Sequence, residues 1–277
     1  MIQLSITTPP LARLVQKRGY QLDELLKVMQ RMMKENLVDG FEFQNLAEWD
    51  PAEPPRDKAQ FEFRIKSWQI CEKHTMIELA EYLQSVRVPI LSVHANRDVG
   101  INLCSETQQG KRRGEQLINN SLFLAERVNA KVCVFHLWDT WKTNFDLKFL
   151  QQTLERIADQ YSTVKASVEN VPINLSDLTP FEAVKNFDWI TLDLRWAAMY
   201  NELDKFEQLK KKIVNVHLRG QLEACQWTMY NAPFNFYDAL DLIRNKWNYS
   251  GLLTLEPERG LKTTEWKDFA AAIKSIH

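Results

Sequence analysis

The sequence has few cysteines, and their spacing excludes two common uses of thiols. Cys71, Cys104, Cys133 and Cys225 stand far apart, and no pair has the two-residue separation of a zinc knuckle or a dithiol redox motif. We therefore predict free thiols and a reducing, cytoplasmic setting.

An excess of either charge is also missing. The chain has 35 basic and 36 acidic side chains and a formal net charge of -1. A protein that binds nucleic acid through its phosphates needs a positive field, which this balance does not supply. We therefore expect no nucleic-acid partner.

Long apolar runs and interdomain linkers are absent as well. The amino-terminal apolar stretch covers only residues 2–6, and no run approaches the roughly 20 apolar residues of a membrane span. Secretion and membrane insertion are therefore disfavoured. No proline-, glycine- or serine-rich linker interrupts the chain, so we predict one domain over residues 1–277.

The sequence instead alternates short apolar runs with longer amphipathic segments. Each run is apolar nearly throughout, as expected of a strand covered on both faces. The segments between them have apolar side chains at the three- and four-residue spacing of helices, as in residues 23–36, 77–86, 115–128 and 266–276. Repeated units of strand and helix predict an α/β fold, a closed (β/α)8 TIM barrel. The predicted strands are residues 2–6, 38–43, 88–94, 131–136, 164–169, 189–193, 213–217 and 252–256.

One stretch departs from this alternation. Residues 46–60 contain AEWDPAEPPRDK, whose three prolines predict no regular structure. We interpret this stretch as a lid over the barrel mouth, with a plain surface loop as an equal alternative.

The last six predicted strands end in ionisable side chains. Because the carboxyl ends of all barrel strands meet at one rim, we expect these side chains to point into one pocket. Any one of them alone would more often cap a helix or make a hydrogen bond in the core. Burying the whole set together is costly unless a cation neutralises it, so the set predicts a divalent metal site. The six residues are His94, His136, Glu169, Asp193, His217 and Glu256.

The last four strand ends lie in the motifs SVENVP, ITLDLRW, VNVHLRG and LTLEPERG. In order and strand position they resemble the metal quartet of the xylose-isomerase-like TIM barrels, which include sugar-phosphate isomerases, ketose 3-epimerases, inosose dehydratases and endonuclease IV. The resemblance covers essentially the whole chain. It implies that the metal ligands are Glu169, Asp193, His217 and Glu256, and that His94 in SVHAN, His136 in VFHLWD and Glu42 in GFEF contact the substrate.

Two departures from the family narrow the function. Family members often have a histidine three residues after the strand-six aspartate, where this chain has Trp196. Endonuclease IV also needs an Asp-x-His motif after the strand-seven histidine, but the only later histidine here is His277. A trinuclear zinc site therefore cannot be assembled, which argues against cleavage of abasic DNA.

A third departure concerns phosphate. Many barrels hold it with glycine-rich loops after strands seven and eight, but these loops offer only Gly220 and Gly260. A phosphorylated substrate could be held by Arg219 or Arg259, but nothing requires it. Both arginines can equally form ion pairs at the rim.

Aromatic side chains follow the same strand ends. Their faces could stack on the C–H face of a sugar ring, or they could simply pack the loops. We predict substrate contacts for Trp138, Trp196 and Arg219. The aromatic set is Trp138, Trp141, Trp196, Trp227 and Tyr230.

These observations lead to a hypothesis of a divalent-metal-dependent isomerase or epimerase that acts on a small sugar, sugar phosphate or polyol through an enediolate. Glu169 and Glu256 would remove and return the proton. The donor set suits one Mn²⁺, Mg²⁺, Co²⁺ or Zn²⁺ per chain, and His94 with His136 could hold a second ion bridged by Glu169. The alternatives are a metal-dependent dehydratase or lyase of a cyclic polyol, a dinuclear hydrolase and a non-catalytic sugar-binding relative. Association into an oligomer also stays open.

Overall fold

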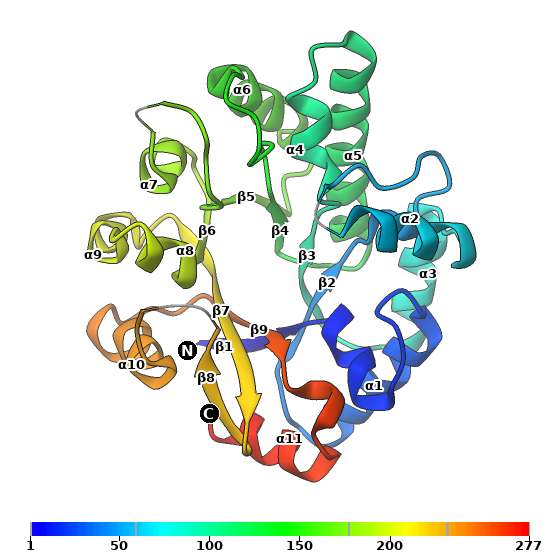
Figure 1. Ribbon diagram of the computed structural model, residues 1–277, viewed down its shortest axis with the longest axis vertical. Helices are drawn as coiled ribbons and strands as arrows, with labels where there is room; N and C mark the ends of the chain where they lie inside the picture. Colours follow the sequence, from blue (N-terminus) through cyan, green and yellow to red (C-terminus); the bar gives the residue numbers. More distant parts are fainter. Residues whose placement is uncertain (1, 59, 177, 231–232, 277) are drawn as a thin grey trace.

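A computed structural model describes residues 2–58, 60–176, 178–230 and 233–276 of the protein. Eight parallel strands close into a barrel surrounded by helices, which confirms the predicted (β/α)8 TIM barrel (Figure 1). The ring runs β1 to β7 in chain order, and β9 closes it by pairing with both β7 and β1. The strands are β1 Gln3–Thr7, β2 Gly40–Gln44, β3 Ile90–His94, β4 Val132–Phe135, β5 Lys165–Glu169, β6 Ile190–Asp193, β7 Ile213–Glu223, β8 Gln226–Met229 and β9 Leu252–Arg259.

The barrel strands form where the apolar runs predict them, but the last two continue further. β7 extends to Glu223 and folds back on the antiparallel strand β8, which the sequence analysis did not predict. The two-residue turn between them is Ala224–Cys225, and both residues have positive φ angles of 46° and 64°. Such hairpin turns usually contain glycine or asparagine, so this one leaves no recognisable signal in the sequence.

The helices cover the outside of the barrel (Figure 1). The four predicted helices are present, although α5 begins seven residues earlier than predicted, at Gln108, because the Thr107 side chain caps it by accepting a hydrogen bond from the Gly110 amide. The α-helices are α1 Leu22–Lys34, α2 Phe61–Ile70, α3 Met76–Val86, α4 Asp98–Leu103, α5 Gln108–Arg127, α6 Leu147–Ala158, α7 Pro180–Val184, α8 Leu194–Met199, α9 Leu203–Phe206, α10 Phe236–Asp241 and α11 Trp266–Lys274. Short 3-10 segments are η1 Pro9–Val15, η2 Ala47–Trp49, η3 Glu207–Leu209 and η5 Leu261–Thr263, and η4 Leu242–Lys246 is a π-helix.

The proline-containing stretch is more ordered than predicted. Ala47–Trp49 forms the 3-10 turn η2 just before the first proline, so the expectation of no regular structure was wrong for these residues. The rest is tied to the rim, because the amides of Arg56 and Asp57 donate to the buried carboxylate of Asp98 at 2.7 and 3.2 Å. The helix α2 that follows was not predicted, since its apolar residues do not form one stripe and several are exposed.

The core has two parts. Apolar side chains fill the layer between strands and helices, whereas small polar groups line part of the barrel interior. Ser5 and Thr254 lie 2.6 Å apart there, and Ser167 and Thr191 lie 2.7 Å apart. Each of these buried hydroxyls has a hydrogen-bond partner, so this polar layer is compatible with ionised side chains at the strand ends above it. Within the described residues, no helix is long and apolar enough to cross a membrane.

Candidate metal centre

His217 on β7 lies at the centre of the predicted site, and Glu42 on β2 holds one side of its ring. The Glu42 Oε2 atom lies 3.2 Å from His217 Nε2. The same oxygen accepts hydrogen bonds from Ser92 Oγ and Asn215 Nδ2, both at 2.9 Å. Glu42 is fully buried, so in this structure it orients the imidazole from the barrel interior. Its predicted contact with substrate stays a prediction.

The other ring nitrogen of His217 faces two carboxylates. Its Nδ1 lies 3.5 Å from an oxygen of Glu169, at the end of β5, and 3.5 Å from an oxygen of Glu256, on β9. Nδ1 is buried and has no hydrogen-bond partner among the described residues. An unpartnered buried nitrogen between two carboxylates is a suitable donor for a metal ion.

Asp193 ends β6 and serves as the cap of helix α8. Its Oδ1 accepts hydrogen bonds from the amides of Arg195 and Trp196 at 2.8 and 3.2 Å. The neighbouring Asn170 fixes the backbone, because its side chain accepts from the Asp193 amide at 2.6 Å and donates to the Asp193 carbonyl at 3.1 Å. One oxygen of Asp193 therefore caps the helix, and Oδ2 is left facing the site.

Arg219 reaches the same carboxylates. It lies two residues after His217 on β7, so strand alternation places both side chains on the inner face. Its Nε contacts Asp193 Oδ2 and lies 3.2 Å from Glu256, and its Nη2 lies 3.5 Å from Glu169. The ion-pair interpretation of Arg219 is therefore the one that this structure shows.

The charges of the site do not balance. A single buried guanidinium contacts the quartet carboxylates and also Glu258, at 2.7 Å. Burial, together with the nearby charges of Glu169 and Glu256, raises the pKa of Asp193 to about 6 despite Arg219. Burial disfavours the charged imidazole, yet Glu42, Glu256 and Glu169 raise the pKa of His217 well above its ordinary value. The site therefore carries an excess of negative charge that a divalent cation would reduce.

The donor chemistry fits such a cation. Carboxylates and one imidazole are the ligands of Mn²⁺, Mg²⁺, Co²⁺ and Zn²⁺ sites in proteins. Among the described residues, two sets of potential ligand atoms lie within 4.8 Å of one another: His94, His136 and Glu169, and Glu42, His217 and Glu256. The quartet that the family resemblance implies, Glu169, Asp193, His217 and Glu256, stays a prediction.

A second group of potential ligands adjoins the first. Glu169 Oε2 lies 2.8 Å from His136 Nε2 and 3.4 Å from His94 Nε2, while Oε1 faces His217. The His94 Nδ1 lies 3.0 Å from the Ala95 carbonyl, which can only accept, so Nδ1 is the donor of that hydrogen bond and Nε2 faces Glu169. Burial lowers the pKa of His136 to about 4, against the opposing charge of Glu169. Glu169 thus faces His217 with one oxygen and the pair of His94 and His136 with the other. The sequence predicts this position for a carboxylate that bridges a second ion.

An aromatic cavity of about 470 Å³ opens beside the site. Trp138 and Trp196 line it together with His136 and Arg219, so the structure brings these predicted substrate-binding residues together. Trp227 does not belong to it, because its ring stacks on Phe236 in the core and its Nε1 donates to the Ala272 carbonyl.

Sequence reasoning missed the residues that support the ligands. Asn170 directly follows Glu169 in SVEN, and Asn215 precedes His217 by two residues on the same face of β7. Strand alternation could have identified Asn215, but the side-chain clamp of Asn170 on Asp193 joins two strands and depends on their register.

The comparisons agree with the geometry at the level of the fold. No protein-family model and no curated protein matches the chain. Solved structures do match, at low identity. D-Allulose 3-epimerase from Methylomonas sp. aligns with a TM-score of 0.64 and 12% identity over 100% of this chain and 98% of that one. The 3-keto-D-glucoside 4-epimerase YcjR from E. coli aligns with a TM-score of 0.59 and 11% identity over 100% and 99%.

A third match was solved with a metal. The IolI protein with a bound zinc atom aligns with a TM-score of 0.60 and 14% identity over 99% of this chain and 96% of that one. These likenesses show that the chain shares the (β/α)8 barrel fold of these proteins. Within this barrel, the candidate ligands lie on β5, β6, β7 and β9 of the present chain, at the carboxyl ends of the parallel strands.

Proposed function

We propose that this protein is a metal-dependent isomerase or epimerase that moves a proton next to the carbonyl of a small sugar. The observation that carries the proposal is the position of His217 Nδ1, at 3.5 Å from both Glu169 and Glu256. Two carboxylates from different strands thus flank one potential metal ligand. The solved epimerases with this fold support the assignment.

The chain's own residues would transfer the proton. A bound divalent ion would supply an electrophile that acidifies the C–H bond beside a carbonyl. Burial opposes ionisation of Glu169, but His136 and His217 hold its pKa well below the usual range, so the carboxylate is in the ionised state that a general base needs. Glu256, which is more exposed than Glu169, would return a proton on the other side.

The walls of the aromatic cavity would select the substrate. Trp138 and Trp196 offer faces for the apolar side of a sugar ring. His136, which lines the cavity, would orient its hydroxyl groups together with His94, whose ring centroid lies 4.9 Å from that of His136. Trp196 stands where family members often have a histidine, so we propose that it replaces a polar contact with an apolar one. This change would alter which sugar binds without removing the two glutamates.

Metal content and proton exchange test the function. We expect elemental mass spectrometry of untagged protein to find one Mn, Mg, Co or Zn per chain, and a second if His94 and His136 also bind an ion. The loaded protein should exchange substrate C–H protons in deuterated water when it is screened with ketoses such as D-fructose, D-tagatose and D-allulose.

Two variants test the role of Glu169 as the base. Glu169→Gln should abolish exchange, and its metal content should be measured alongside to separate loss of the base from loss of the ion. Glu126→Gln, on the exposed outer face of α5, is the matched control and should leave exchange unchanged. Exchange that persists at the wild-type rate in Glu169→Gln would contradict the assigned base, and a loaded protein inert toward every ketose and every ketose phosphate would contradict the function.

A further inference from the structure

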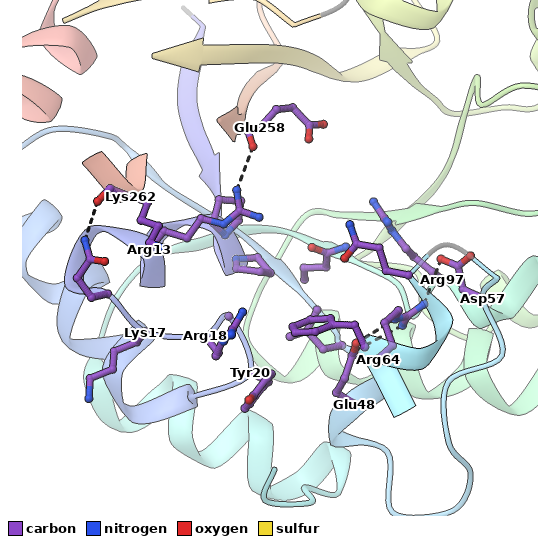
Figure 2. Close-up of a pocket in the computed structure, with 18 residues that line it drawn as sticks. Arg13, Lys17, Arg18, Tyr20, Glu48, Asp57, Arg64, Arg97, Glu258 and Lys262 are labelled. Atoms are coloured by element: carbon purple, nitrogen blue, oxygen red, sulfur yellow. Dashed lines mark hydrogen bonds and ion pairs between the residues drawn. The ribbon is translucent and has the colours of Figure 1, made fainter. Parts of the chain in front are cut away.

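A second large cavity lies at the barrel mouth, next to the first. It has a volume of about 650 Å³ and is enclosed by segments that are distant in sequence (Figure 2). These segments are η1 with the loop after it, the stretch after β2, the start of α2, the loop after β3 and the end of β9.

The acidic side chains of this cavity are already paired. Glu48 accepts from Arg64 Nε at 2.9 Å, and Asp57 lies 3.1 Å from Arg64 Nη1 (Figure 2). Glu258 is paired with Arg219 of the metal centre at 2.7 Å. The cavity therefore offers no free carboxylate among its described residues to balance further cations.

Several cations of the cavity have no such partner. None of them forms an ion pair with an acidic side chain in the described part of the chain. Arg13 donates only to the backbone carbonyl of Glu258, at 3.0 Å, and the Arg18 guanidinium lies 5.2 Å from the centre of the Phe63 ring. All five side chains are exposed, and together they give this side of the barrel mouth a positive potential that attracts anions. The cations are Arg13, Lys17, Arg18, Arg97 and Lys262.

The basic cavity adjoins the proposed active site. Asp57 and Arg97 line both this cavity and the aromatic cavity that contains His136. Arg97 is close enough for its charge to contribute to the lowered pKa of His136. A ligand with its anionic group among the cations could therefore extend past Arg97 toward the quartet.

We propose that the basic cavity binds the phosphate group of a phosphorylated sugar whose carbonyl end reaches the metal centre. Guanidinium groups match the geometry of phosphate oxygens. Arg13 and Arg18 approach from the segment after β1, and Arg97 approaches from the loop after β3. The sequence directed attention to the loops after strands seven and eight, whereas these arginines follow β1 and β3. This inference rests on the proposed function and names its substrate class.

Isothermal titration calorimetry with inorganic phosphate, in the absence of added metal, tests the site directly. The wild-type protein should bind phosphate saturably, and Arg18→Gln with Arg97→Gln should weaken that binding at least tenfold. The matched control is Arg112→Gln with Arg127→Gln on the exposed face of α5, where Arg127 also lies over a phenylalanine ring, Phe123, at 5.9 Å. The control pair should bind phosphate like the wild type, and circular dichroism should verify that both double variants fold.

The outcomes separate this proposal from the proposed function. Absence of saturable phosphate binding, or equal weakening by both double variants, would overturn the phosphate site even if neutral ketoses exchange protons. Binding of D-gluconate as tightly as glycerol 3-phosphate would also overturn it, because the site would then be a general carboxylate site. Conversely, phosphate binding that depends on Arg18 and Arg97 would support the site even if the metal-dependent exchange fails.

Discussion

Replacing Arg219 with glutamine should weaken the metal-free protein and strengthen its binding of a divalent ion. The guanidinium is nearly buried and contacts Asp193, Glu169, Glu256 and Glu258. Removing one partner from a buried ion pair costs about 3–5 kcal/mol, because the remaining charge is left uncompensated. At about 2–4 °C per kcal/mol for a chain of this size, the melting temperature in EDTA should fall by about 6–20 °C.

The metal affinity should change in the opposite direction. In the wild type, an arriving cation has to displace the guanidinium from the quartet carboxylates, while the contacts of Arg219 with Glu258 and with the Trp196 ring can remain. In the variant, the carboxylates are free to bind the ion. We expect about 10- to 100-fold tighter binding of Mn²⁺, which corresponds to about 1.4–2.8 kcal/mol. Added Mn²⁺ should then restore most of the lost melting temperature.

Calorimetric titration with Mn²⁺ and thermal melts with and without the ion measure both effects. Arg195→Gln is the matched control, because Arg195 stands on the same rim over the rings of Trp196 and Tyr230 and forms no ion pair with a carboxylate of the described residues. An Arg219→Gln variant that binds Mn²⁺ no more tightly than the wild type would refute competition between the guanidinium and the ion.

Other changes test the surroundings of the site. Burial holds the folded-state pKa of His136 at about 4, below its ordinary 6.5. As the pH falls, the unfolded chain therefore gains a proton that the folded protein lacks. Between about pH 7 and about pH 4, the unfolding free energy of the metal-free wild type, measured with urea, should fall by about 3 kcal/mol relative to that of His136→Asn. Equal pH dependence of the two proteins would contradict that assignment. Asn170→Ala removes the hydrogen-bond partners that the Asn170 side chain offers to the amide and the carbonyl of Asp193. The protein should lose about 1–3 kcal/mol of stability for each group. A variant as stable as the wild type would show that water replaces these two hydrogen bonds. Gly100→Ala places a methyl group 2.5 Å from the Trp138 carbonyl, so it should destabilise the protein by about 1–3 kcal/mol and change the tryptophan fluorescence. An unchanged thermal melt and an unchanged fluorescence spectrum would count against tight packing at Gly100.

The barrel and its rim could be predicted from the sequence because apolar runs and their terminal residues are local features. His217, Glu169 and Glu256 are brought together by the strand ends alone. The direction of Arg219 could not be predicted in the same way. Alternation places its side chain inward, but whether the guanidinium meets a phosphate or the quartet depends on distances between four strands.

The residues around the ligands were even harder to predict from the sequence. Glu42 lies near the end of a predicted strand, as the ligands do, but β2 continues to Gln44. Only the depth of Glu42 in the barrel shows that it meets His217 from below. The basic cavity was missed because its cations come from loops with no common motif. Arg13 and Arg18 follow β1, whereas Arg97 follows β3, and the pairing of both strands with β2 brings those segments together.

The two strands that flank β7 limit how Arg219 can move. Arg219 is paired with Glu256 on β9, and the next residue, Gly220, is paired with Met229 on β8. The backbone there cannot swing outward as a loop does, so the guanidinium can leave the carboxylates only by rotation about its own side-chain bonds. Because such rotations need no backbone rearrangement, we expect them to be faster than the opening of lids, which takes microseconds or longer. The observed rate of metal uptake should therefore rise in proportion to the concentration of the ion, without the plateau that a slow opening step would impose.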